Sequence, residues 1–581
     1  MTDRIPENTD PCTKKKSFCG HIFHSMLFTG TFSVSVVYIM LVCDSIIAGH
    51  FFDDPGVAAV NIVRPAAGLI AFLSGIFAFG TSILYSREIG AMRKERAGEL
   101  FGQGLILSLC ISVFSGIMLF LLRDFYFMAN GVDGVILELA LALYRFMPLS
   151  AALEVLSTFL SQVIYADGDE LCSTISYTLR IIGKIVFSIV LTEKYGISGI
   201  ILGTAIGNAL GILVSCWHFF RKGNTLHFVW HFSVSDMGMI VKFSIVEAVI
   251  YISWAAADFL LIRHVEQYYG DIEHIVLSVV IGLIEFGVVL DGVGLAVQPL
   301  LETYLGEKNH ILIKRLMHIA GRAAVIEGLI ANVIIFIFAK QFCLLFHINN
   351  GPQFPASILA VRIVSMGLVF CSALSLVTSY YMLIDHVMLS AGITIFKDGL
   401  LYSILPIICS LMFGINGMWA GLLLAPILGL IFSVVFIRFY YGKERFPFLL
   451  ESAYTDIVVM DDTLTSDSCS VLSRKVGDIM LDHGCRNSIA GKASLFVEEI
   501  GLTILEKNSR NKKPVLIEIS VLLNEGQAAV IERDSGIIFD ITDTDLQIEG
   551  LSGYVLGNLM VHQQGKAHII TTGYNRNMIV F

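Results

Sequence analysis

The sequence predicts a polytopic α-helical membrane protein, with twelve transmembrane helices in two six-helix bundles, plus a small cytoplasmic α/β sandwich domain. Of its 581 residues, 55% are hydrophobic and only 15% are charged, whereas soluble proteins have about 25% charged residues. The composition changes at Glu451. From there on the chain has 18 acidic and 11 basic residues, which account for seven of its ten net negative charges. The acidity therefore belongs mainly to a soluble tail.

Long apolar runs, each able to supply the roughly 20 residues that a helical span needs, define the membrane part. The predicted spans are 24–48, 57–84, 102–122, 136–165, 170–192, 196–220, 239–262, 275–300, 317–346, 356–383, 387–411 and 414–441. The predicted domains are an N-terminal tail (1–23), a first lobe (24–220), a linker (221–238), a second lobe (239–441) and a soluble domain (455–581). The 11 cysteines are scattered singly, without a metal-ligand motif, and are interpreted as reduced packing residues.

The distribution of basic residues predicts the orientation of the spans. If the N-terminus is cytoplasmic, 15 Lys and Arg residues lie in inner segments and four in outer loops. Cytoplasmic loops carry such an excess of positive charge. We therefore expect a multi-pass protein of the cell inner membrane, with both termini in the cytoplasm.

The two halves of the membrane part resemble each other. Tyr195-Gly-Ile-Ser-Gly199 recurs 218 residues later as Phe413-Gly-Ile-Asn-Gly417. Arg145 and Arg180 recur at a shift of 217 as Arg362 and Lys397. Because each repeat has an even number of spans, both start on the same membrane face, and an axis along the membrane normal relates them. Two bundles around a shared cavity are typical of alternating-access transporters.

Several motifs together resemble the multidrug and toxic compound extrusion (MATE) family. They are Val42-Cys-Asp-Ser-Ile-Ile-Ala-Gly49, Val57-Ala-Ala-Val60, Pro65, Gly80-Thr-Ser-Ile-Leu-Tyr-Ser-Arg-Glu-Ile-Gly90 and Gln298-Pro299. The resemblance covers residues 24–441 and implies an ion-coupled exporter of small molecules. Each motif is loose, and their order and spacing make the match specific.

Ionisable residues inside the spans are the candidate transport residues, because a charge in the bilayer core costs about 2.5 kcal/mol or more. The residues expected to form secondary intramembrane charges, through ion pairs or by reaching from span ends, are Glu154, Arg145, Arg362 and Lys397. For two acids of the second lobe, Glu247 and Asp258, the structural alternative to a role in transport is a salt bridge to Arg362 or Lys397.

The resemblance implies specific roles for four residues. Asp44 matches the acid of the first lobe that couples transport to an ion, and Glu247 matches an acid of the second lobe. Asp258 is the approximate repeat counterpart of Asp44, so Glu247 or Asp258 could bind a cationic substrate. Many members have Asn and Asp on span five, where this chain has Lys184 and Ser188. Lys184 could pair with Asp44 or with Glu154, and these alternatives leave H⁺ and Na⁺ open as coupling ions.

The tail resembles the ATP-binding domain of histidine kinases and anti-sigma factors (the GHKL superfamily). Its pattern predicts helices over 471–483 and 492–506 and strands over 515–523 and 527–533. Glu499, Asp534 and Gly536 match the nucleotide-binding motifs. Thr503 stands where the family has a Mg²⁺-binding Asn, and Ile538 replaces a glycine. The domain is therefore expected to be degenerate, without ATP turnover.

The sequence favours a secondary active transporter, a cation- or proton-coupled antiporter that exports drugs or other amphiphilic molecules, over an enzyme. No P-loop motif for an ATP-driven pump occurs. A lipid-linked sugar flippase, expected to have a basic central cavity, and a membrane sensor kinase are the alternatives. Expected partners are the substrate, H⁺ or Na⁺, membrane lipids and a cytoplasmic regulator of the tail. No cofactor, metal or nucleic acid is expected.

Overall fold

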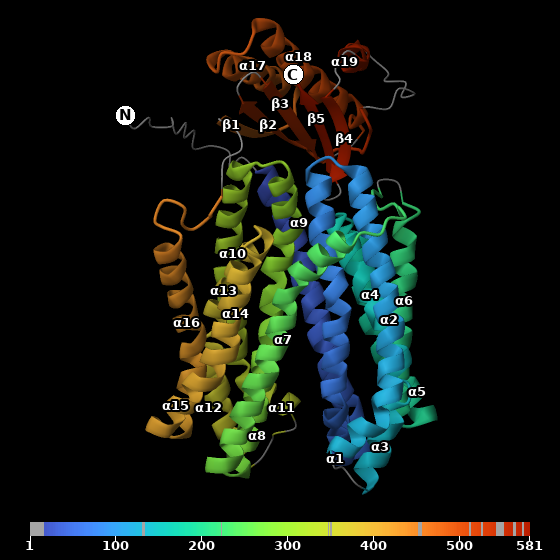
Figure 1. The fold of residues 1–581 in the computed structure, drawn as a ribbon, viewed down its shortest axis with the longest axis vertical. Helices are drawn as coiled ribbons and strands as arrows, with labels where there is room; N and C mark the ends of the chain where they lie inside the picture. Colours follow the sequence, from blue (N-terminus) through green and yellow to red (C-terminus); the bar gives the residue numbers. More distant parts are fainter. Residues whose placement is uncertain are drawn as a thin grey trace. The chain divides into compact units, whose positions relative to one another are not determined.

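The computed structural model of the chain has two compact units (Figure 1). One comprises Phe23–Glu451 and is called the membrane unit; the other comprises Met1–Ile22 with Ser452–Phe581 and is called the sheet unit. The structure describes residues 17–581 except 131–133, 222–223, 347, 349–350, 451–455, 511–512, 525–526, 542–550, 562–564 and 572–573. Most of the predicted N-terminal tail lies outside the described residues, as does the side chain of Glu247.

The first lobe runs from α1 to α6. Its helices are α1 (Phe18–Gly90), α2 (Lys94–Asn130), α3 (Gly134–Tyr144), α4 (Met147–Ala166), α5 (Glu170–Tyr195) and α6 (Ser198–His218). The helix α1 holds two spans, because Asp53 leaves the helical conformation (φ 51°) directly before Asp54-Pro55. Proline at this point removes a backbone donor and starts the second span.

The second lobe runs from α7 to α16. Its elements are α7 (Val234–Tyr268), α8 (Asp271–Phe286), η1 (Gly287–Asp291), α9 (Gly292–Gly306), α10 (His310–Ile337), α11 (Ala339–Leu345), α12 (Gln353–Ser365), α13 (Leu368–Leu383), α14 (Val387–Thr394), η2 (Ile395–Leu401), α15 (Tyr402–Phe413) and α16 (Ile415–Tyr440). Figure 1 shows this lobe in green to orange beside the blue and cyan first lobe.

Each of the twelve predicted spans falls on helical structure. Ten helices of the described chain are long and apolar enough to cross a membrane, and α12 with α13 makes an eleventh if the pair, bent by 44°, is one span. The remaining predicted span, 239–262, lies within α7. Because the spans alternate in direction, Gly90, Gly306 and Tyr440 share one face of the membrane unit, called here the terminal face. Asp53 and Tyr268 lie at the opposite face.

The predicted repeat is visible in the backbone. Gly196 ends α5 with φ 63°, and Gly414 ends α15 with φ 69°, a left-handed conformation that favours glycine. The glycine three residues later packs on the preceding helix in both lobes: a Cβ on Gly199 would lie 2.2 Å from the Thr192 nitrogen, and one on Gly417 would lie 2.2 Å from the Cys409 oxygen. Both glycines therefore allow close pairing of the last two spans of their lobe.

The sheet unit has an antiparallel sheet with the strand order β1-β2-β3-β5-β4. Its elements are β1 (Asp456–Thr463), α17 (Ser466–Asp482), α18 (Asn487–Lys507), β2 (Leu516–Asn524), β3 (Gln527–Asp534), α19 (Leu551–Val561), β4 (Gly565–Thr571) and β5 (Tyr574–Val580). The helices α17 and α18 cover one face of the sheet (Figure 1), and Val476, Phe496 and Ile519 meet in the core between them. The predicted helices and strands of the tail are thus confirmed.

Candidate functional site

The first lobe contains a buried ion pair between two predicted site residues. Lys184 on α5 lies 2.9 Å from Oδ1 of Asp44 on α1, and its side chain is only 4% exposed. Its Nζ also donates to the backbone oxygen of Met40, at 2.5 Å. Of the two partners that the sequence left open for Lys184, the structure selects Asp44. The pair joins the first and fifth spans of the lobe.

Two more charged residues surround this pair. Arg180, one turn before Lys184 on α5, is buried and donates from Nε to Oδ1 of Asn208 on α6, at 3.0 Å. Glu154 on α4 has Arg180, Lys184 and Asp44 as its charged neighbours. With two acids and two bases, the centre of the first lobe is balanced in charge. Protonation of Asp44 would leave an excess positive charge and weaken its contact with Lys184 between α1 and α5.

The second lobe has a charged centre at an irregular helix. Lys397 lies 3.3 Å from Oδ2 of Asp398 within the π-helical turn η2, a kind of distortion that is frequent at functional sites. Asp291, at the end of η1, has both residues as charged neighbours and accepts a hydrogen bond from Oγ of Ser375, at 2.5 Å. Lys397 is thus held by neighbouring acids within its own lobe.

Between the lobes, acids outnumber bases in a cluster that we call the inter-lobe acid cluster. Arg64 on α1 forms an ion pair with Glu285 on α8, and both residues are the charged neighbours of Asp258 on α7. Nearby, the Tyr38 hydroxyl donates to the backbone oxygen of Gly282, at 3.1 Å, so that α1 and α8 are in contact. The cluster therefore brings two carboxyl groups and one guanidinium together between the lobes.

A second charged contact between the lobes, called here the terminal latch, lies near the terminal face. Arg87 of α1 donates two hydrogen bonds to the carboxylate of Glu302 on α9, from Nε at 2.6 Å and from Nη2 at 3.2 Å. Its Nη1 donates to Asp385 at 2.7 Å, and Nη2 donates to the backbone oxygen of Leu383 at 2.7 Å. The Glu302 side chain is 0% exposed. In the latch, the guanidinium therefore binds both oxygens of a buried carboxylate, which is the strong, bidentate form of this ion pair.

Arg145 and Arg362 do not join these clusters. Each is exposed, and each guanidinium lies over an aromatic ring, Phe146 for Arg145 at 5.5 Å and Phe336 for Arg362 at 5.3 Å. Arg362 also donates to the backbone oxygen of Phe336, at 3.3 Å. The predicted alternative that acids of the second lobe pair with Arg362 is not supported by any contact of the described residues. Glu247 has no described side chain.

Sequence reasoning missed four charged residues of the inter-lobe contacts: Arg64, Arg87, Glu302 and Asp385. Arg64 was not among the charged candidates, although it lies inside predicted span 57–84. Glu302 fell just beyond predicted span 275–300, whereas α9 continues to Gly306. Arg64 could have been found by the rule that every ionisable residue within a span is a candidate. Its pairing with Glu285, 221 residues away, leaves no local signal.

In the sheet unit, Asp534 lies in a buried polar chain on the helix-covered face of the sheet. Its Oδ1 accepts hydrogen bonds from the Gly536 nitrogen, at 2.7 Å, and from Nδ2 of Asn575, at 3.2 Å. The carboxyl group of Glu532, two residues earlier on β3, lies against Asp534 and accepts from Nδ2 of Asn577, at 2.7 Å. Burial raises the pKa of Asp534 to about 6 and that of Glu532 well above its usual range.

Thr503 and Gly536 are held by internal contacts, whereas Oε2 of Glu499 is buried without a hydrogen-bond partner among the described residues. The Thr503 hydroxyl donates to the backbone oxygen of Glu499 at 2.7 Å, as is common within helices. A Cβ on Gly536 would lie 2.5 Å from Nδ2 of Asn508, so this side chain fills the space beside the glycine. Asn508 in turn accepts from the Ile537 nitrogen, at 3.1 Å. The segment after Asp534 is thus held against α18.

Comparisons with known proteins concern the membrane unit. The MatE family model matches residues 31–190. A solved structure described as the outward-facing conformation of a multidrug resistance MATE family transporter of the MOP superfamily covers 74% of this chain and 98% of its own, with 20% identity and a TM-score of 0.67. The chain has the MATE fold.

Two further solved structures agree with this fold. A MOP superfamily transporter from Pyrococcus furiosus, described as having a binding pocket whose reverse polarity suggests a different function, covers 74% of this chain and 98% of its own, with 20% identity and a TM-score of 0.67. The Vibrio cholerae MATE transporter VcmN in its bent form covers 72% and 95%, with 17% identity and a TM-score of 0.65. No curated protein matches the chain. With its apolar helices, the chain is a multi-pass membrane protein.

Proposed function

We propose that the chain is a secondary active transporter of the MATE type, an antiporter that exports amphiphilic small molecules in exchange for H⁺ or Na⁺. The observation that carries this proposal is the MATE fold, combined with charged contacts between its two lobes. Alternating access requires that such contacts form and break as the lobes move. We further propose an inner-membrane location with both termini in the cytoplasm, in line with the charge asymmetry of the loops.

We infer that the substrate is cationic rather than a lipid-linked sugar phosphate. The inter-lobe acid cluster has two carboxylates, Asp258 and Glu285, against the one guanidinium of Arg64. An amphiphilic cation placed between the lobes would gain Coulomb attraction there, and a phosphate would be repelled. The polarity of the pocket is also the feature to which the description of the Pyrococcus furiosus transporter attributes a different function. An acidic surplus in this chain therefore favours the export of cations.

The pair of Asp44 and Lys184 supports a coupling role for Asp44. While Asp44 is ionised, it neutralises Lys184 and holds α5 against α1. A proton or Na⁺ bound to the Asp44 carboxylate would compete with Lys184 and loosen this contact. Because the pair is nearly buried, a change in its charge state carries a large energy and can select between two arrangements of the lobe.

We expect Asp44→Asn to abolish gradient-driven efflux, because an asparagine side chain can neither exchange an ion nor neutralise Lys184. The same change should lower thermal stability, since breaking a buried ion pair costs about 3–5 kcal/mol. The double variant Asp44→Asn with Lys184→Met removes both charges, so it should regain stability and remain inactive. Efflux from proteoliposomes under imposed H⁺ and Na⁺ gradients, together with the unfolding midpoint, measures both effects.

The matched control for this experiment is the exposed ion pair of Arg123 and Asp124 on α2, whose side chains are 47% and 82% exposed. The double variant Arg123→Met with Asp124→Asn should leave both efflux and stability unchanged, as is usual for surface pairs. If the Asp44→Asn and Lys184→Met double variant transports at the wild-type rate, the pair is structural and Asp44 takes no part in coupling. The gradient that drives wild-type efflux identifies the ion.

We propose that the sheet unit is a GHKL-like regulatory domain without catalysis. The support is the order of its helices and strands, together with the fully buried Asp534, whose Oδ1 already accepts two hydrogen bonds and whose neighbour is Glu532. An adenine amino group that bound at Oδ1 would have to displace these partners. Loss of the Mg²⁺-binding Asn at Thr503 removes a metal ligand as well. A cytoplasmic regulator would then act on the unit by a route other than nucleotide binding.

The full-length protein is expected to bind ATP with Mg²⁺ no more tightly than millimolar in isothermal titration. Restoring the family motif with Thr503→Asn and Ile538→Gly should not raise the affinity to micromolar, because Asn508 and Asn575 still fill the site. Micromolar binding by the wild type would contradict this prediction and support an ATP-dependent function. Micromolar binding by the restored variant alone would attribute the loss of nucleotide binding to the two motif positions.

A further inference from the structure

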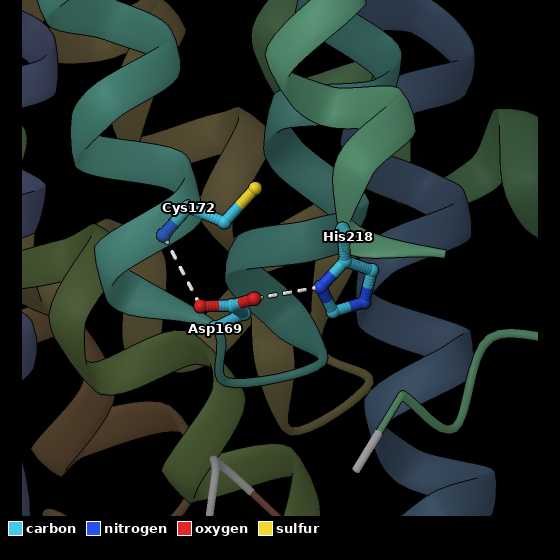
Figure 2. Close-up of side chains that lie close together, drawn as sticks. All are labelled: Asp169, Cys172 and His218. Carbon is cyan, nitrogen blue, oxygen red and sulfur yellow. Dashed lines mark hydrogen bonds and ion pairs between the residues drawn. The ribbon is translucent and has the colours of Figure 1, made fainter. Parts of the chain in front are cut away.

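A cluster of metal-ligating side chains lies at the terminal face of the first lobe, away from the proposed transport residues. Asp169 precedes α5, Cys172 lies in its first turn, and His218 ends α6. One potential ligand atom from each lies within 4.8 Å of the others. Figure 2 shows the Asp169 carboxylate between the other two: it accepts from the Cys172 nitrogen at 3.1 Å and lies 2.8 Å from Nδ1 of His218.

We propose that Asp169, Cys172 and His218 bind a divalent transition metal ion of the zinc class. Carboxylate, thiolate and imidazole are the protein ligands of Zn²⁺, and three of them leave a fourth position for water. Nδ1 of His218, the Asp169 carboxylate and the Cys172 thiolate would be the ligand atoms. Cys172 and His218 are only 4% and 2% exposed, so the site is shielded from competing solvent.

The surroundings of His218 provide an independent argument. Its second ring nitrogen, Nε2, lies 3.0 Å from Oδ2 of Asp167, which is 5% exposed. Tyr85 donates to Oδ1 of the same carboxylate at 2.5 Å, so Asp167 is held in place from two sides. Metal-binding histidines commonly donate their free N–H to such a carboxylate, which fixes the tautomer and orients the ring. His218 is thus oriented with Nδ1 toward Asp169 and Cys172.

The guanidinium of Arg221 also contacts the carboxylate of Asp169. Arg221 donates from Nη1 to both oxygens of Asp169, at 2.5 and 2.6 Å. Both ring nitrogens of His218 face carboxylates: Nδ1 faces Asp169 and Nε2 faces Asp167. The Arg221 side chain is 40% exposed, so it can turn from Asp169 toward solvent when a metal ion binds.

The ligand atoms need only a small adjustment to close on a metal ion. Bond lengths of about 2.0–2.3 Å to zinc require ligand atoms closer together than the present 4.8 Å limit. The Cys172 thiol now donates to the backbone oxygen of Val214, at 3.5 Å, a weak hydrogen bond that a thiolate would give up. Because α4, α5 and α6 all meet at this turn, a bound ion would hold the three helices together at the terminal face.

The test is Co²⁺ binding to the purified full-length protein after chelator treatment, because Co²⁺ takes the place of zinc and reports sulfur ligation in its absorption. We expect one equivalent of Co²⁺ to give a near-ultraviolet sulfur-to-cobalt charge-transfer band that Zn²⁺ abolishes. Cys172→Ser should remove the band. Asp167→Asn should keep the band and weaken binding by about 10–100-fold, the usual effect of losing a carboxylate that supports a ligating histidine.

Cys216→Ser is the matched control, because Cys216 is exposed and lies on α6, two residues before His218. It should leave the band unchanged. Absence of the band in the wild type, or its persistence in Cys172→Ser, would overturn the proposal and leave the cluster as a network of ion pairs. Thermal unfolding with and without Zn²⁺ provides a second readout: the wild type should be stabilised by Zn²⁺, and the Cys172→Ser variant should be stabilised much less.

Discussion

Replacing Arg87 with alanine is expected to weaken the closure of the two lobes at the terminal face by about 3–5 kcal/mol. The Glu302 side chain, which is 0% exposed, would lose the guanidinium that donates two hydrogen bonds to its carboxylate. A buried carboxylate without a counter-charge is strongly unfavourable, so the lobes should separate at this face and admit water. Hydrogen exchange of α9 and of the segment around Asp385 should become faster in the variant.

Two further variants distinguish this effect from a general loss of stability. Arg93→Ala breaks an ion pair with Glu88 on the same face, but Arg93 is 61% exposed, so an effect of about 0–1 kcal/mol is expected. Adding Glu302→Gln to Arg87→Ala removes the unpaired buried charge and should restore much of the protection against hydrogen exchange. If the amide hydrogens of α9 exchange at the wild-type rate in Arg87→Ala, the latch does not contribute to closure of the lobes at the terminal face.

Replacing Asp534 with asparagine is expected to stabilise the sheet unit by about 3 kcal/mol at neutral pH, because a tenfold change in proton affinity corresponds to about 1.4 kcal/mol. Burial raises the pKa of Asp534 from 3.8 to about 6. The side-chain oxygen of the asparagine could still accept from the Gly536 nitrogen and from Asn575. Its amide nitrogen could donate to the carboxyl group of Glu532, which lies against this position.

The pH dependence of the wild type should have a definite sign. Between pH 4 and pH 6 the unfolded chain has already released the Asp534 proton while the folded state still binds it, so stability falls as the pH rises. The contribution of Asp534 is fully present below its unfolded pKa of 3.8 and is lost once the pH passes its folded pKa of about 6. In Asp534→Asn this slope should be smaller.

Native-state hydrogen exchange of β3 and β5 in the full-length protein, corrected for the intrinsic pH dependence, measures this stability. Asp482→Asn, at the exposed end of α17, is the control and should leave the slope unchanged. If hydrogen exchange in Asp534→Asn is no slower than in the wild type at neutral pH, the buried carboxyl pair does not lower the stability of the sheet unit. A steeper slope in the variant would contradict the assignment as well.

The candidate site could be predicted from the sequence only in part. Asp44 and Lys184 are recognisable because ionisable residues stand out within apolar spans. Their pairing required the structure, since Glu154 was an equally available partner by spacing. The ion pair of Arg64 with Glu285 and the contact of His218 with Asp169 join residues 221 and 49 positions apart. No periodic pattern encodes such contacts.

By itself, the sequence determined where the apolar spans lie, the repeat of the two halves, and two helices and two strands of the tail (α17, α18, β2 and β3). Apolar runs, turn glycines such as Gly196 and Gly414, and strand alternation act over a few residues, so the local chain specifies them. Only the tertiary structure decided which charges neutralise each other. That choice depends on which helix faces meet, and in a low-dielectric interior the energy of each charge is set by its nearest partner across the contact.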